Sequence, residues 1–169
     1  MHLHQLLIGI AAVLILGTVF AHLYLSAKNS KFTFANVAEG TVPEGNKSYL
    51  ADAAFSSRFL LGKIGSDTNH VAVCTASDIP LGIVTDEAAA AEDLVNVAVF
   101  GASEGTRKVV AGAAITLGDM VVPTASGKVI KLPTAGGTYY IIGRCLLAAG
   151  ADGDVIEIAP SFPVQRVVT

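Results

Sequence analysis

One histidine, His70, is available for chemistry beyond the apolar first segment of the chain, because the other three are His2, His4 and His22. A Ser-His-Asp triad would have to be built around that single imidazole. His70 follows Asn69 at the junction between a turn-like stretch and an apolar run, which is typical of an exposed turn histidine. No histidine and carboxylate in the body of the chain have the spacing of metal ligands. The sequence therefore predicts neither a nucleophilic triad nor a metal site.

Carboxylates gather in two short stretches. The first holds Asp86, Glu87, Glu92 and Asp93, and the second holds Asp152 and Asp154. A pair of acids for glycoside hydrolysis needs a cleft lined with aromatic side chains to hold the sugar, and the chain contains no Trp. A calcium site at 152–154 lacks the further oxygen ligands of an EF-hand loop. We expect these acids to solvate turns and to start strands, and we expect the protein not to be an enzyme.

No cofactor site is predicted either. The glycines of residues 101–112 are not followed by Gly-Lys-Ser/Thr and a helix, so they do not form a phosphate-binding loop. The two cysteines, Cys74 and Cys145, fall inside apolar runs. The favoured interpretation is two small buried side chains, and whether they pair stays open at this point.

The composition excludes further classes of partner. Of the 169 residues 52% are hydrophobic and 15% are charged, the net charge is -3, and no block of Lys or Arg occurs. Nucleic-acid binding needs clustered Lys and Arg to neutralise phosphates, so a nucleic-acid partner is not expected. No small-molecule substrate is expected, because no catalytic constellation is present. The length is sufficient for a real hydrophobic core.

Residues 1–27 form an apolar leader. The run from Leu6 to Leu25 carries no charge and is just long enough to cross a bilayer as a helix. Its first residues lack the Lys or Arg of a secretory signal, although Ala21 and Ala27 are small enough for a cleavage site. Three interpretations stay open: a membrane span, a cleaved leader, or a misassigned start.

Residues 28–58 are expected to form an extended arm with at most one short strand, at 32–37. Two glycines and a proline within 38–46 interrupt regular structure. The arm carries scattered apolar side chains that either cover an edge of the protein's own core or dock on another subunit. The candidate partner contacts are Phe32, Phe34, Val37 and Val42.

Residues 59–169 are expected to form a β-rich body. Short apolar runs separated by Gly, Asp and Asn turns indicate strands, with 62–69 as a turn and 160–169 as a terminal edge strand. The runs lie at 59–61, 70–74, 81–85, 94–100, 108–110, 128–132, 139–147 and 155–158. This pattern predicts an all-β fold, a small antiparallel barrel or sandwich. Alternation is only partial, so several strands are expected to be covered on both sides, most simply by other subunits.

A spacing indicates an internal duplication. Gly143 follows Gly82 by 61 positions, and Asp154 follows Asp93 by the same 61. Each copy reads as strand, turn rich in Ala and acids, Asp, strand. The stretch 109–122 lies between the two similar segments and is interpreted as their hinge.

Sequence motifs in 109–122 and in the segments on either side of it resemble those of the capsid cement, or head decoration, proteins of tailed phages. The resemblance runs over 42–159 and rests on six short motifs: Pro-Leu-Gly-Ile-Val at 80–84, Asp-Leu-Val-Asn-Val at 93–97, Lys-Val-Val-Ala-Gly-Ala-Ala-Ile-Thr-Leu-Gly-Asp-Met-Val at 108–121, Ser-Gly-Lys-Val at 126–129, Ile-Gly-Arg-Cys-Leu at 142–146 and Ala-Gly-Ala-Asp-Gly-Asp-Val-Ile-Glu-Ile at 149–158. It implies a structural protein that binds the outer surface of an assembled capsid shell and stabilises it. The implied partner is the major capsid protein, the implied oligomer a homotrimer, and the implied location the virion, with assembly in the host cytoplasm.

The apolar leader departs from that pattern. Taken at face value, a span followed by Ala-Gly-Ala-Ala-Ile-Thr-Leu-Gly-Asp-Met at 111–120 also resembles the SAF-type β-clip modules of membrane-anchored pilus assembly proteins. The alternative function is therefore a membrane-anchored envelope or pilus assembly factor.

Overall fold

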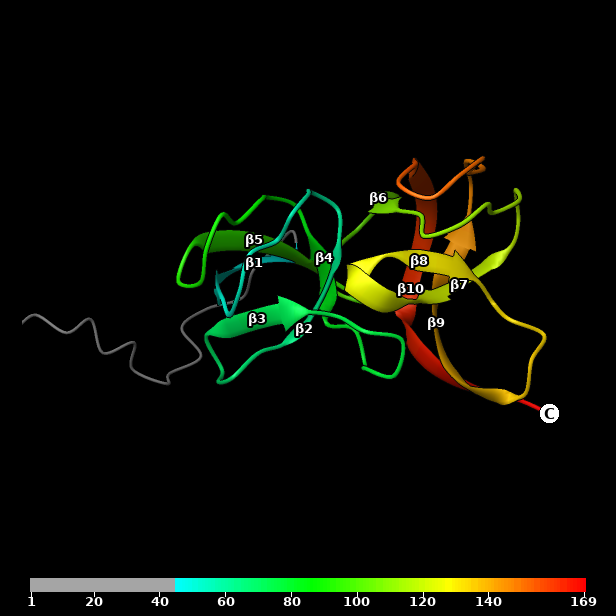
Figure 1. The fold of residues 1–169 in the computed structure, drawn as a ribbon, viewed down its shortest axis with the longest axis horizontal. Helices are drawn as coiled ribbons and strands as arrows, with labels where there is room; N and C mark the ends of the chain where they lie inside the picture. The colour runs from blue at the N-terminus through cyan, green and yellow to red at the C-terminus, as the bar shows by residue number, and fades with distance from the viewer. Residues whose placement is uncertain (1–44) are drawn as a thin grey trace, which may run out of the picture. The chain divides into compact units, whose positions relative to one another are not determined.

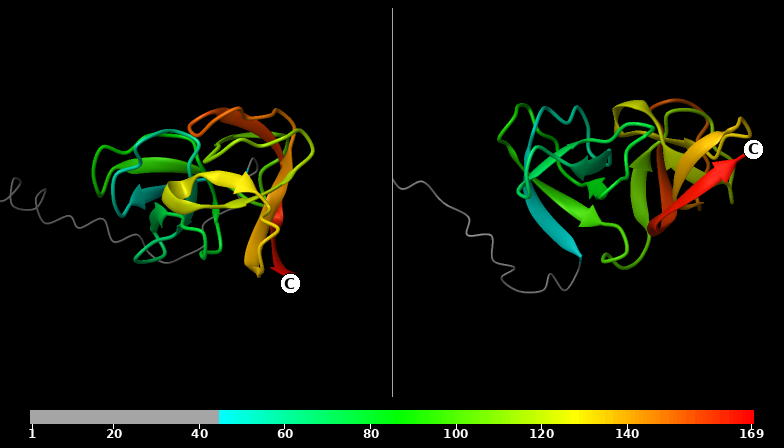
Figure 2. Two further views of the ribbon diagram at one scale, coloured as in Figure 1. Left: turned by 45° about the vertical axis from the view of Figure 1, so that its right-hand side comes forward. Right: turned by 90° about the horizontal axis from the view of Figure 1, so that it is seen from below.

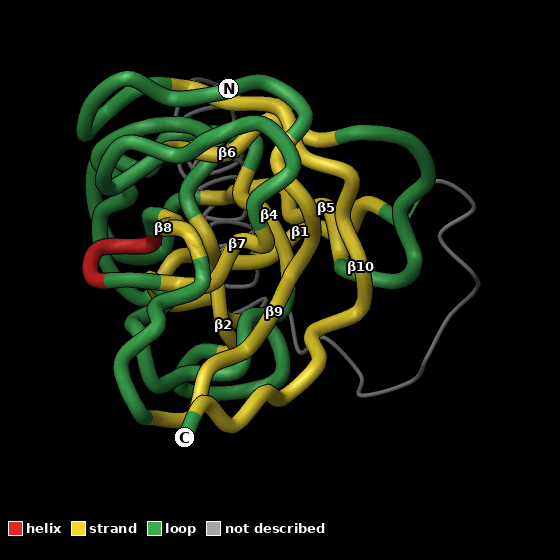
Figure 3. The backbone as a smooth tube through the Cα atoms, turned by 90° about the vertical axis from the view of Figure 1, so that its right-hand side faces the viewer, coloured by secondary structure: helices red, strands yellow, loops and turns green. Residues whose placement is uncertain are grey.

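The computed structural model describes residues 45–169, which form strands and no α-helix (Figures 1 and 3). The strands are β1 (Asn46–Ala51), β2 (Leu61–Ile64), β3 (His70–Val73), β4 (Gly82–Val84), β5 (Leu94–Val99), β6 (Arg107–Val110), β7 (Met120–Pro123), β8 (Val129–Lys131), β9 (Gly137–Cys145) and β10 (Val155–Val168), with the 3-10 turn η1 (Ala125–Gly127) between β7 and β8. The predicted all-β fold is confirmed. Within these residues no helix is long and apolar enough to cross a membrane.

The first five strands close into a barrel in the order β1-β3-β2-β4-β5. Four of its five pairings are antiparallel, as expected. The fifth is parallel, with Leu50 opposite His70 and Ala51 opposite Val71. A closed barrel leaves no strand edge within the sheet, so its backbone groups are satisfied internally.

The last five strands form a second sheet in the order β6-β10-β9-β7-β8. An isolated parallel bridge between Ala111 and Val129 joins the chain just after β6 to β8, and it nearly closes this sheet as well. Each pairing of the first barrel has a counterpart here. The bridge between Phe55 and Ala88, for example, recurs as the bridge between Ile115 and Ala149.

The predicted duplication is therefore a duplication of a whole five-stranded barrel. In Figures 1 and 2 the cyan to green strands β1 to β5 are one copy, and the strands from the green β6 through yellow to the red β10 are the other. The interpretation of 109–122 as a hinge is wrong, because this stretch contains the second half of β6 and most of β7, which are strands of the second copy.

The paired Asp residues of the two copies perform the same local task. The Oδ2 atom of Asp93 accepts hydrogen bonds from the backbone N–H groups of Ala89 and Ala90, at 2.8 and 3.0 Å. In the second copy the Oδ2 atom of Asp154 accepts from the N–H groups at 150 and 151, at the same distances. The residue before each Asp has a positive φ, 67° at Glu92 and 90° at Gly153. The same tight turn therefore occurs in both copies, and in each copy the strand begins directly after its Asp.

The two barrels share a hydrophobic core. Side chains of the first copy, Leu61, Cys74, Ile83 and Phe100, are buried in one cluster with the core of the second copy. Backbone hydrogen bonds join the copies as well, from Gly127 N–H to Cys74 C=O at 2.9 Å. The second copy of the same chain therefore covers the outer face of β2 and β4. The expectation that other subunits supply this cover is corrected.

Three boundaries differ from the sequence-based expectation. β1 lies in a segment where no strand was expected, and it pairs with β3 and β5. β2 occupies 61–64, most of which was expected to be a turn, since alternation is hard to recognise in so short a strand. The tail is a strand, but it continues β10 without a break apart from a bulge between Pro160 and Val164. Tertiary pairing overrides the weak local signal in each case.

Candidate partner-binding surface

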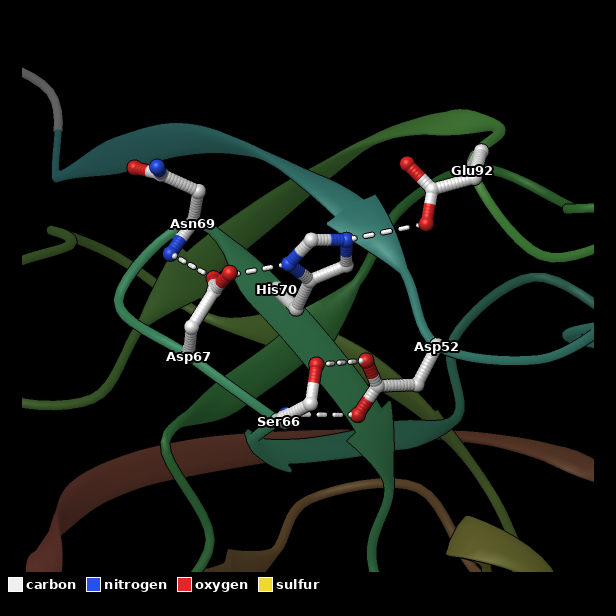
Figure 4. A network of polar contacts seen from close by, with 6 residues as sticks. All are labelled: Asp52, Ser66, Asp67, Asn69, His70 and Glu92. Carbon is white, nitrogen blue, oxygen red and sulfur yellow. Dashed lines mark hydrogen bonds and ion pairs between the residues drawn. The ribbon is translucent and has the colours of Figure 1, made fainter. Parts of the chain in front are cut away.

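His70 lies in a small polar network at the start of β3 (Figure 4). Its Nδ1 atom is 2.7 Å from Asp67 Oδ1, and its Nε2 atom is 3.1 Å from Glu92 Oε1. The side chain is only 14% exposed, so the expectation of an exposed turn histidine is corrected. The imidazole links the turn before β3 to the turn before β5. Hydrogen bonding to Asp67, and then to Glu92, raises the pKa of His70, while the hydrogen bond from His70 lowers the pKa of Asp67.

The same network leaves no base for a nucleophile. Both ring nitrogens of His70 face carboxylates, and the nearby Ser66 donates its hydroxyl to Asp52 at 2.7 Å. A triad needs a hydroxyl that donates to the imidazole, and among the described residues no hydrogen bond joins a hydroxyl to His70. His70 therefore connects two turns through hydrogen bonds to Asp67 and Glu92.

The other candidate residues form hydrogen bonds or ion pairs within the fold, or are buried. The Asp86 carboxylate accepts from the backbone N–H of Asn96 at 2.9 Å, and Asp152 forms an ion pair with Lys128 at 2.7 Å. Both cysteines are free and buried. Burial raises the pKa of Cys74 to about 12 and also raises the pKa of Cys145, so both remain thiols at neutral pH.

The predicted partner contacts of the arm, Phe32, Phe34, Val37 and Val42, lie outside the described residues. They stay predictions. The structure instead reveals an apolar surface near the C-terminus that the sequence had indicated only as a terminal edge strand.

This surface is a two-stranded ribbon formed by the outer parts of β9 and β10. From Pro160 to Val168, β10 pairs with β9 on one side, and its pairing with β6 ends at Ile158. β9 pairs with β7 only through Gly143 and Arg144. Residues 137–141 and 161–168 thus form a ribbon, the β9–β10 ribbon, with no further strand on either side within the described part of the chain. In Figure 1 the two strands run together toward the C-terminus.

The ribbon exposes apolar side chains on both of its faces. Val164 is 56% exposed and stands opposite Ile141, whereas Val167 is 62% exposed, stands opposite Thr138, and points to the other face because strand side chains alternate. Phe162, at 71% exposure, lies in the bulge and touches the Gly101 turn with one ring edge. A two-stranded ribbon is marginal on its own, and exposed apolar edges usually mark protein interfaces.

A second group of exposed apolar residues lies near the junction of β7 and β9. It consists of Leu117, Met120, Leu146 and Leu147, with exposures from 42% to 66%. Met120 stands opposite Arg144, two residues before Leu146, so the register brings the group together. This group could not be predicted from the sequence, because its members belong to apolar runs whose other residues are buried.

Comparisons with known proteins agree with this architecture. A family model described as phage cement protein matches residues 59–160, more than half of the chain. No curated protein matches the chain. Among solved structures, the chain is similar to the head fiber gp8.5 N base of bacteriophage phi29, with 18% identity, a TM-score of 0.54, and coverage of 70% of this chain and 94% of that one. Identity at that level shows a shared fold and no more.

Proposed function

Because this chain belongs to the phage cement protein family, we propose that it binds the outer surface of a capsid shell and stabilises that shell. The family makes it a virion-associated structural protein of a phage. The observation that supports a role in assembly is the β9–β10 ribbon, whose apolar side chains Phe162, Val164 and Val167 are 56% to 71% exposed. Burial of such side chains is the dominant favourable term in protein association.

The ribbon is proposed to join copies of this chain, and the proposed oligomer is a trimer. Both strand edges of the ribbon are free within the described residues, so another ribbon can add to it by backbone hydrogen bonds while the valines pack. Pro160 and Pro163 have no backbone N–H, so the bulge lacks two of the hydrogen-bond donors that an added strand would need. This limits open-ended strand addition. A closed oligomer is the outcome that such an edge favours.

The arm is proposed to contact the major capsid protein through Phe32, Phe34, Val37 and Val42. The apolar leader at 1–27 remains part of this proposal, but the expected division into an arm at 28–58 and a body at 59–169 changes, because β1 places 46–51 in the first barrel. The virion surface is the proposed location, with assembly in the host cytoplasm. The membrane-anchored alternative depends on the leader, which lies outside the described residues, and the family match favours the virion.

We further propose that the protein acts by binding and catalyses no reaction. A cement family supports a structural role. The His70 network supports the same view, because both ring nitrogens are engaged by carboxylates.

Shell binding is tested by cosedimentation of the purified full chain with capsid shells that lack it. We expect saturable binding and a shift of shell disruption to higher temperature. Failure to cosediment, or binding without any gain in shell stability, would refute the proposed role.

The part played by the ribbon is tested by sedimentation equilibrium of a V164S/V167S variant. We expect the wild type to be oligomeric and the variant to dissociate, because two exposed valines lose their apolar contact. The matched control is Val155→Ser, which changes a 47% exposed valine at the start of the same strand, outside the ribbon. An equal effect of the control would assign the oligomer to another surface.

A further inference from the structure

A cleft lies on the outer wall of the first barrel, and the proposed function assigns no role to it. It has a volume of about 270 Å³ and lies where β1, β4 and β5 meet the start of β6. Its lining consists of Asn46, Phe59, Ile83, Thr85, Asn96, Ala98, Thr106, Arg107 and Lys108. We refer to it as the Arg107 cleft. Pockets for small organic ligands usually measure about 300–1,000 Å³, so this one lies just below that range and has room for an inserted side chain.

The lining carries positive charge and no carboxylate. Arg107 and Lys108 belong to it, and Arg58 donates its Nε–H to the backbone oxygen of Thr85, a lining residue, at 2.8 Å. The Arg58 guanidinium and the Lys108 ammonium both lie over the Phe59 ring, at 5.4 and 5.8 Å from its centre. Two cations therefore lie over one aromatic ring in the wall of the cleft, and Arg107 adds a further positive charge to the lining.

None of these cations is neutralised within the described part of the chain. The ion pairs there join Lys63 to Asp78, His70 to Asp67 and Glu92, and Lys128 to Asp152. The nearest acids have other positions. Asp86 accepts from the N–H of Asn96, and Glu157 stands opposite Lys108 across the β6–β10 pair without forming an ion pair with it.

The side chain of Arg107 has a hydrogen-bond donor without an acceptor. Its Nη1 atom donates to the backbone oxygen of Thr106 at 3.5 Å, whereas its Nε atom is buried without a hydrogen-bond partner, the one buried side-chain polar atom of the described residues in that condition. A buried charged donor without an acceptor is unfavourable, because it has lost its hydration and gained nothing in return. A guanidinium presents a planar fork of donors that matches a carboxylate in two hydrogen bonds.

We propose that the Arg107 cleft receives a carboxylate side chain from the capsid shell, with Arg107 as the central donor and Lys108 and Arg58 as flanking charges. This inference rests on the proposed function and adds a specific polar contact to an interface otherwise described by apolar side chains. The guanidinium of Arg107 is only partly buried, and it acquires a charged acceptor on assembly through the part that lines the cleft. The amides of Asn46 and Asn96 line the same space and can supply further donors.

The test is cosedimentation with shells that lack the protein, at low and at high salt, for the wild type and for Arg107→Gln. We expect at least about tenfold weaker binding of the variant at low salt, because loss of one member of a buried charge pair strongly weakens association. We also expect Arg107→Lys to recover part of the loss, since it keeps the charge without the planar fork. Lys131→Gln, which removes an exposed charge on β8, is the matched control and is expected to bind like the wild type.

Two further measurements separate the possible outcomes. The melting temperature of Arg107→Gln is expected to equal or exceed that of the wild type, because Nε has no partner to lose; a clear decrease would make Arg107 a structural residue and overturn the inference. The Arg107 Nε–H signal of the free chain is expected to respond to acetate, and a response to inorganic phosphate alone would overturn it in favour of a phosphate site.

The failure of this inference is distinguishable from the failure of the proposed function. Wild type and Arg107→Gln that bind shells equally well overturn the cleft assignment and leave surface binding intact. A wild type that does not bind shells at all overturns both.

Discussion

At the scale of single residues, the molecule uses its titratable groups to hold turns in place. His70 fastens the turn at Asp67 to the turn at Glu92, and Asp93 and Asp154 each bind two backbone N–H groups. Each group has a structural partner at hydrogen-bond distance. For His70, whose pKa is raised, protonation therefore affects stability, and this can be measured.

For His70 we predict a pH-dependent contribution to stability. Its pKa is raised above the ordinary value of 6.5 by Asp67 and Glu92, so the folded state binds the proton more tightly than the unfolded state. The stabilisation is fully present below about pH 6.5 and is lost as the pH rises through the higher pKa of the folded state.

This is checked by melting the wild type and His70→Gln between pH 5 and pH 9, a range in which Asp67 stays ionised because its pKa is lowered. We expect the largest difference in melting temperature at the acidic end and a shrinking difference toward pH 9. A difference in melting temperature that is constant or that grows with pH would contradict the stabilising role of protonated His70.

For the two cysteines we predict inertness in the folded state. Desolvation raises the pKa of Cys74 to about 12 and also raises that of Cys145, and both side chains are 0% exposed. The thiolate is the reactive species, so a disulfide reagent at pH 8 should modify neither cysteine until denaturant is added, and then both. Rapid labelling of one thiol in the native protein would show local opening around it.

At the scale of elements, the duplication repeats packing constraints as well as strand order. Gly82 starts β4, and its equivalent Gly143 lies in β9. A Cβ atom on either would lie against the carbonyl oxygen of the neighbouring strand, at Ala98 and Ala159 respectively, far inside normal contact. Backbone cannot move aside as a flexible side chain can. The two glycines are therefore required by the close approach of strands in each barrel.

We predict that Gly82→Ala and Gly143→Ala each lower the free energy of unfolding by about 1–3 kcal/mol, as overpacking of a closed structure does. Denaturant titration measures this. The control is Gly150→Ala, whose Cβ would lie in ordinary contact with Asp154 Oδ2 at 3.6 Å, and it should stay within about 0.5 kcal/mol of the wild type. Equal effects at Gly82 and Gly150 would remove the close-approach argument.

At the scale of the whole described structure, the two barrels form one cooperative unit. Leu61, Ile83 and Phe100 of the first copy are buried with the core of the second, and Gly127 N–H binds Cys74 C=O across the joint. Neither barrel keeps its outer apolar face covered without the other. We therefore expect a single unfolding transition.

The prediction is tested at the joint with Ile83→Ala. Ile83 is 1% exposed, and large-to-small changes at such sites cost about 2–5 kcal/mol. Ile64→Ala is the matched control, because Ile64 is 65% exposed, and it should change stability by about 0.5 kcal/mol or less. Calorimetry of Ile83→Ala should show one transition at a lower temperature. Two separate transitions would mean that the barrels fold independently.

The sequence by itself determined the fold class, the duplication and the family. Short β-branched runs between Gly and Asp turns predicted strands, and the spacing of 61 positions identified Gly82 with Gly143 and Asp93 with Asp154. These features are local, since turn chemistry and side-chain alternation act within a few residues. The same holds for the carboxylates, whose turn-stabilising role follows from their position before a strand.

The tertiary structure decided what depends on contacts between distant segments. It placed β1 in the barrel, covered β2 and β4 with the second copy, and left the β9–β10 ribbon without cover within the described residues. It also brought Arg58 and Lys108 over the Phe59 ring and placed Arg107 in the same cleft, although they come from two regions of the chain. Composition counts charges and apolar residues, but only the pairing of strands determines which of them remain free to bind a partner.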